Sequence, residues 1–142
     1  MKSANKKSNT ILLWGMTALF SFRVIAQLIV ANFEAGFLPP FESWHSGTMP
    51  YWLLLLFQVL ILIIMLTTNY RYCSGKLIGK PLIGRGLLIF GVIYLLVMLL
   101  RLGLGLILFS EDRWFSNYIP TFFHLVLAVW VLTIGRIHYK QC

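Results

Sequence analysis

Long apolar runs separated by short polar segments dominate the chain and predict four membrane-spanning helices. The runs cover residues 11–31, 50–68, 86–109 and 118–137. Each is close to the roughly 20 residues that an α-helix needs to cross a bilayer at about 1.5 Å per residue. The sequence therefore predicts an all-α fold, in which residues 1–142 form a single four-helix transmembrane bundle.

Composition agrees with this pattern, because 59% of the residues are hydrophobic and only 11% are charged. A soluble domain of this length does not need so much apolar surface. The formal net charge is +8, but the cations flank the apolar runs instead of forming a separate basic face. Membrane orientation explains this charge, so a lipid bilayer is the expected environment and no nucleic-acid partner is expected.

The distribution of charge predicts an orientation. Basic residues precede the first run, lie between the second and third, and follow the fourth, whereas all four acids lie in the other two connections. The positive-inside rule then places both termini in the cytoplasm. No small-x-small cleavage site interrupts the first run, so it is expected to stay as a helix and not to be removed as a signal peptide. The expected location is a bacterial inner membrane.

Polar residues inside the apolar runs supply the candidate site. An arginine at the centre of such a helix costs about 2.5–3.5 kcal/mol on insertion scales. Every run carries a polar group about 6–12 Å from its outer end, at 1.5 Å per residue. These residues are Arg23, Gln27, Gln58, Arg101 and His124. We expect them to face one another in an outer polar layer, with almost no polar side chains in the inner half of the bundle.

A stripe of mostly small or polar residues on the third run supports this layer. Its members recur at helical spacing and are Gly91, Tyr94, Met98, Arg101 and Gly105. Small residues allow transmembrane helices to approach closely, so the stripe is expected to face the bundle.

Two interpretations of the layer remain open. In the first, it is an internal packing device in which carboxylates from the outer connections pair with the two arginines. The available carboxylates are Glu34, Glu42, Glu111 and Asp112. In the second, it lines an outward-facing pocket for a lipid phosphate, a carboxylate or a quinone, because arginine binds anions bidentately and glutamine and histidine can donate to carbonyl oxygens.

The first outer connection is too apolar for a freely solvated loop, and Pro39-Pro40 prevents a regular helix there. It is expected to fold back as a lid that carries Glu42, Trp44 and His45. The alternative is an interfacial loop with no ligand beneath it. A haem held by His45 and His124 is a further hypothesis, and no metal-ligand motif is present.

Several functions fit these features. The first is a small membrane protein that binds a lipid-like, quinone-like or anionic molecule, or an accessory subunit of a larger membrane complex. A membrane enzyme is the alternative, either a quinone-linked oxidoreductase component or a lipid-modifying enzyme, with His124, Arg23 and Arg101 at its centre. A transporter is the third, and four spans would serve it only as a homo-oligomer. The sequence assigns no cofactor and no catalytic residue.

Overall fold

Four long helices make up almost all of the described structure. The computed structural model describes residues 2–33, 50–108 and 118–140 of the chain. Its helices are α1 (Lys2–Asn32), α3 (Tyr51–Cys73), α4 (Pro81–Ile107) and α6 (Tyr118–Lys140). All four are long and apolar enough to cross a membrane. The predicted all-α architecture with four spans is therefore confirmed, and the chain has the build of an integral membrane protein.

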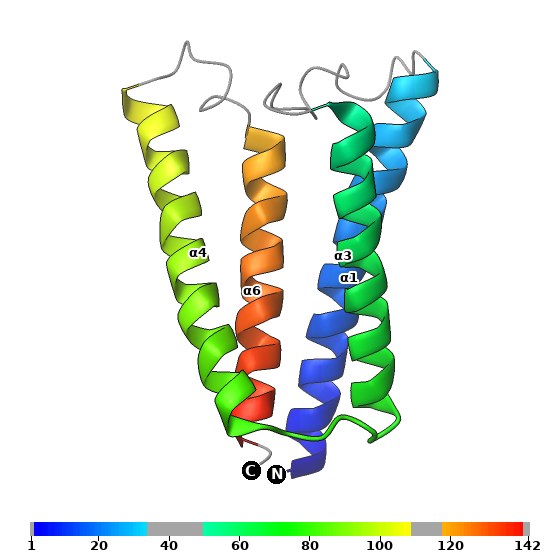
Figure 1. Cartoon of the computed structure of the whole chain (residues 1–142), viewed down its shortest axis with the longest axis vertical. Helices are drawn as coiled ribbons and strands as arrows, with labels where there is room; N and C mark the ends of the chain where they lie inside the picture. The colour runs from blue at the N-terminus through cyan, green and yellow to red at the C-terminus, as the bar shows by residue number, and fades with distance from the viewer. Residues whose placement is uncertain (1, 34–49, 109–117, 141–142) are drawn as a thin grey trace.

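The helices run alternately up and down, so both ends of the chain lie at the same end of the bundle (Figure 1). This end, drawn at the bottom of Figure 1, also carries the connection between α3 and α4 and is called the lower end. The opposite end is called the upper end. The predicted outer polar layer belongs to the upper half of the bundle.

Two of the helices are central and two are peripheral. Helix α4 packs along α6, and α1 contacts both α3 and α6. In the most apolar windows of α1 and α6, 44% and 50% of the residues are buried, against 11% for both α3 and α4. Helices α3 and α4 therefore present most of their apolar side chains outward, where lipid would solvate them.

Glycines allow the close packing of α4 against α6. A Cβ atom added at Gly84 would lie 2.6 Å from the backbone nitrogen of Tyr139, and one at Gly135 would lie 3.0 Å from the backbone nitrogen of Leu88. Side chains at these positions would push the two backbones apart. The predicted role of small residues on α4 holds at Gly91 as well, where an added Cβ would lie 2.7 Å from Leu132.

The lower end of α3 closes with a Schellman motif. Gly75 adopts a left-handed conformation at φ 73°, which a residue without Cβ tolerates best. The backbone N–H of Gly75 donates to the carbonyl of Tyr72, and that of Lys76 donates to the carbonyl of Arg71 at 2.9 Å. The chain then crosses to α4, which begins at Pro81, where proline is favoured because the first helical N–H has no partner.

At the lower end of the bundle, each helix extends beyond its predicted boundary. Helix α1 begins at Lys2 and α4 at Pro81, and α3 and α6 continue to Cys73 and Lys140. The predicted spans marked where hydrophobicity falls. A helix can continue beyond that point, because its backbone hydrogen bonds persist after the side chains become polar.

Candidate functional site

Gln27 of α1 and Gln58 of α3 form one part of the upper polar layer. Nε2 of Gln58 donates a hydrogen bond of 3.0 Å to Oε1 of Gln27, and both side chains are buried. The remaining amide atoms, Nε2 of Gln27 and Oε1 of Gln58, have no hydrogen-bond partner among the described residues. The pair thus keeps one unused donor and one unused acceptor inside the bundle.

Arg23 lies one turn below Gln27 on the same face of α1. Its side chain is only 4% exposed, and its Cζ lies 5.4 Å from the centroid of the Phe123 ring on α6. Its Nε has no hydrogen-bond partner among the described residues. A cation over an aromatic face gains about 0.5–2 kcal/mol, which offsets only part of the cost of burying a guanidinium.

Tyr94 of α4 and His124 of α6 form the second part of the layer. The Tyr94 hydroxyl is hydrogen-bonded to Nδ1 of His124, and the two rings meet edge to face with centroids 5.9 Å apart. Which atom donates depends on the histidine tautomer. The charges of Arg23 and Arg101 both act on this pair, and Arg101 is itself buried on α4.

The structure therefore brings the five predicted residues together in two groups. One group joins α1 to α3 through the glutamines, and the other gathers Arg23, Arg101 and His124 between α1, α4 and α6. Two contributors, Tyr94 and Phe123, were not among the predicted site residues. The helical spacing does place Tyr94 on the predicted stripe with Arg101, seven residues away, but it does not distinguish a packing residue from a site residue.

A second polar network lies in the lower half of the bundle. Nδ2 of Asn69 donates to Oγ1 of Thr17 at 2.7 Å, and Nε1 of Trp130 donates to Oδ1 of Asn69 at 3.2 Å. All three side chains are buried. The expectation of almost no polar groups in the inner half is therefore wrong. The predicted second run ends at residue 68 and so does not include Asn69, whereas α3 continues to Cys73.

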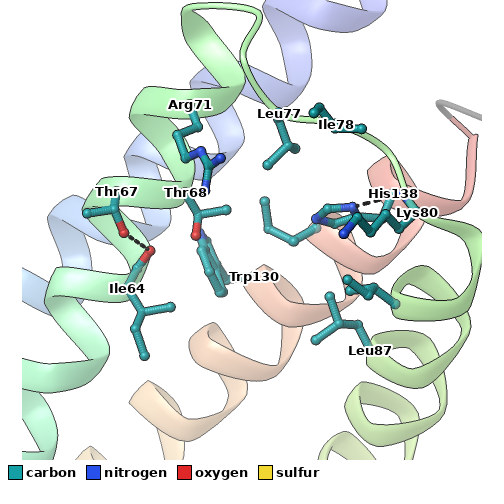
Figure 2. Close-up of a pocket in the computed structure, with 12 residues that line it drawn as sticks. Ile64, Thr67, Thr68, Arg71, Leu77, Ile78, Lys80, Leu87, Trp130 and His138 are labelled. Atoms are coloured by element: carbon teal, nitrogen blue, oxygen red, sulfur yellow. Dashed lines mark hydrogen bonds between the residues drawn. The ribbon is translucent and has the colours of Figure 1, made fainter.

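A cavity of about 420 Å³ also lies in the lower half (Figure 2). Residues of α3, α4, α6 and the connection between α3 and α4 form its walls, and none of the five predicted site residues lines it. Trp130 lies deep in this cavity, while Arg71, Lys80 and His138 lie nearer the lower end. The cavity and the upper polar layer are thus separate features of the bundle.

Part of the predicted site lies outside the described residues. This is so for the lid residues Glu42, Trp44 and His45, and for the carboxylates that were candidates for pairing with the arginines. The lid and the His45–His124 haem hypothesis stay predictions. Within residues 2–33, 50–108 and 118–140, no three histidine, cysteine or acidic side chains come together as a metal site would require.

Comparisons with known proteins add no family to this description. The chain matches no protein-family model, no curated protein and no solved structure.

Proposed function

We propose that the protein binds an amphiphilic molecule in the bilayer and holds its polar head in the upper polar layer. The head would be an anion or a carbonyl compound, such as a lipid phosphate, a carboxylate or a quinone. In this proposal both termini lie in the cytoplasm, the membrane is a bacterial inner membrane, and the polar layer is reached from its outer side.

The observation that carries this proposal is the state of Arg23. Its guanidinium is almost completely buried, its Nε has no hydrogen-bond partner among the described residues, and Phe123 compensates it only in part. A buried donor without a partner costs about 1–3 kcal/mol, and a charged one costs more. A bound anion or carbonyl oxygen would remove that cost.

Gln27 adds a second donor to the same face. Its Nε2 also lacks a described partner, and it stands one turn above Arg23 on α1. Two donors at this spacing suit a head group with more than one acceptor oxygen, because phosphates, carboxylates and quinones all carry at least two.

Native mass spectrometry with extraction and identification of copurifying molecules tests the proposal. Wild type would be compared with Arg23→Leu, Arg101→Leu and Gln27→Leu, and with Arg136→Leu as a control, because Arg136 is exposed at the lower end. A defined molecule should be retained by wild type and the control and lost from Arg23→Leu. If no molecule copurifies and Arg23→Leu keeps the stability of wild type, the proposal is wrong. That result would favour a role as an accessory subunit of a larger membrane complex.

The hydrogen bond between Tyr94 and His124 favours one alternative, a membrane enzyme. A phenol and an imidazole in direct contact can transfer a proton. Tyr94→Phe would then abolish turnover of the copurified molecule without abolishing its retention. A transporter site is typically formed by discontinuous helices, and no helix among the described residues is interrupted.

A further inference from the structure

The lower cavity is bounded by three helices and by the connection between α3 and α4. Its lining includes positions between 64 and 71 of α3, Lys80 just before α4, Ile83 and Leu87 of α4, and positions between 130 and 138 of α6. Seven residues of α-helix span about 10 Å, so the cavity extends about two turns up from the lower end of α3. Its volume of about 420 Å³ falls in the range of small-molecule sites.

The polarity of the cavity changes along this length. Near the lower end its walls carry the cations Arg71 and Lys80, and further up they are formed by apolar side chains such as Ile64, Leu87 and Trp130. Figure 2 shows the Arg71 side chain entering from α3, while Lys80 lies beside His138 on the opposite wall. The lower end of the cavity, which carries Arg71 and Lys80, is called its cationic mouth. The walls further into the bundle are mainly apolar.

The wall opposite Arg71 is held in place by a contact between the connection and α6. The backbone N–H of Lys80 donates to Nδ1 of His138 at 3.4 Å. This contact fixes the residue that carries the second cation at the point where α4 begins. Arg71 belongs to the last turn of α3 and is fixed by the helix itself.

No carboxylate among the described residues neutralises this mouth, because residues 2–33, 50–108 and 118–140 contain no aspartate or glutamate. The surrounding surface of the lower end is also cationic. Besides Arg71 and Lys80, which are themselves exposed, its exposed basic residues are Lys6, Lys7, Lys76, Arg85, Arg136 and Lys140. Charge complementarity therefore selects an anionic occupant.

The apolar interior selects an occupant with a hydrocarbon chain. Close packing joins α4 to α6 and α1 to α3 and α6, and the cavity occupies space between α3 and α4, the two peripheral helices. A chain that enters there can continue into the bilayer beside α3 and α4, whose outward faces are apolar. Basic pockets between transmembrane helices at the membrane surface are known to bind anionic lipid head groups.

We infer that this cavity binds an anionic phospholipid, with its phosphate between Arg71 and Lys80 and an acyl chain along Ile64 and Trp130. This site is independent of the upper polar layer, because the two share no lining residue. Phospholipid here would occupy the space that protein side chains leave between α3 and α4, and so would stabilise the position of α4 and α6 relative to α3.

A charge-matched pair of double variants tests the inference. Arg71→Gln/Lys80→Gln removes the two cavity cations, and Lys76→Gln/Arg136→Gln removes two exposed cations of the same end that do not line the cavity. The full-length proteins would be placed in nanodiscs of equal parts phosphatidylglycerol and phosphatidylcholine. Native mass spectrometry after gentle release then gives the ratio of retained anionic to zwitterionic lipid.

We expect the cavity variant to lower this ratio about tenfold relative to the control variant, a factor that corresponds to about 1.4 kcal/mol. Circular dichroism and thermal unfolding would establish that both variants are folded. Equal ratios in two folded variants would overturn the inference, because the attraction would then come from the general charge of the lower end.

Two further arms keep the test decisive. Ile64→Trp fills the cavity from α3, and Ile63→Trp places the same ring on a neighbouring position that does not line the cavity. Only Ile64→Trp should lower lipid retention. Glycerol 3-phosphate, added to the delipidated protein, should bind far more weakly than phosphatidylglycerol. If it bound equally well, the cavity would be a site for small anions and the assignment to a phospholipid would be wrong.

Discussion

Asn69 of α3 and Trp130 of α6 are joined by a buried hydrogen bond of 3.2 Å, from the indole Nε1 to the amide Oδ1. The same amide donates to Thr17 of α1, so one side chain connects three helices. Among the described helices, α3 otherwise packs closely only against α1. This hydrogen bond is therefore a specific link between the peripheral helix α3 and the central helix α6.

Replacing Asn69 by leucine should destabilise the bundle. Asn69→Leu removes the bonds to Thr17 and Trp130 and leaves the buried indole N–H without its partner, which costs about 1–3 kcal/mol. Thermal or denaturant unfolding followed by circular dichroism measures the loss. Tyr70→Leu changes the exposed neighbour and should alter the unfolding free energy by about 0.5 kcal/mol or less. Equal stability of the two variants would mean that the network contributes nothing.

The glutamine pair should behave as a coupled unit. Gln27→Leu and Gln58→Leu each leave one buried amide without its partner, whereas the double variant removes both amides together. In a double-mutant cycle we expect a coupling free energy of about 0.6 kcal/mol, and at most about 1.7 kcal/mol, as for other hydrogen bonds between transmembrane helices. Strict additivity would show that the hydrogen bond of 3.0 Å has no energetic consequence.

Gly84 should tolerate no side chain, while Gly86 should. A Cβ at Gly84 would lie 2.6 Å from the backbone nitrogen of Tyr139, but one at Gly86 would meet nothing within 4 Å. Gly84→Ala should therefore lower the unfolding free energy by about 1–3 kcal/mol. Gly86→Ala should be neutral or stabilising by up to about 1 kcal/mol, because alanine favours the helix. Unfolding curves of the two variants check this, and a stable Gly84→Ala would argue against the close approach of α4 and α6.

Thiol labelling can determine the orientation in the membrane. Cys73 is exposed at the lower end, so in a Cys142→Ser background a membrane-impermeant maleimide should label it only after the cells are permeabilised. As the opposite control, Asn32→Cys at the exposed upper end of α1, in a Cys73→Ala/Cys142→Ser background, should be labelled in intact cells. The reverse pattern would place the lower end outside and contradict the positive-inside prediction.

The sequence alone determined the number of helices, the alternation of their directions and the polar residues of the upper layer. These follow from local properties. About 20 apolar residues in a row must be a spanning helix, since only a helix satisfies its backbone hydrogen bonds within one segment in lipid. An arginine or glutamine within such a run must turn toward protein, because lipid offers it no partner. Arg23 and Gln27 are identifiable on this ground from the sequence alone.

Only the tertiary structure decided how those residues are paired. Which helices are central, the Tyr94–His124 bond and the link from Asn69 to Trp130 depend on rotation and spacing between helices. An apolar run of nearly uniform hydrophobicity carries little information about these. The lower cavity is likewise a product of helix packing, since α3, α4 and α6 all contribute to its walls. Its cations, Arg71 and Lys80, are visible in the sequence, but the fact that they line one cavity is not.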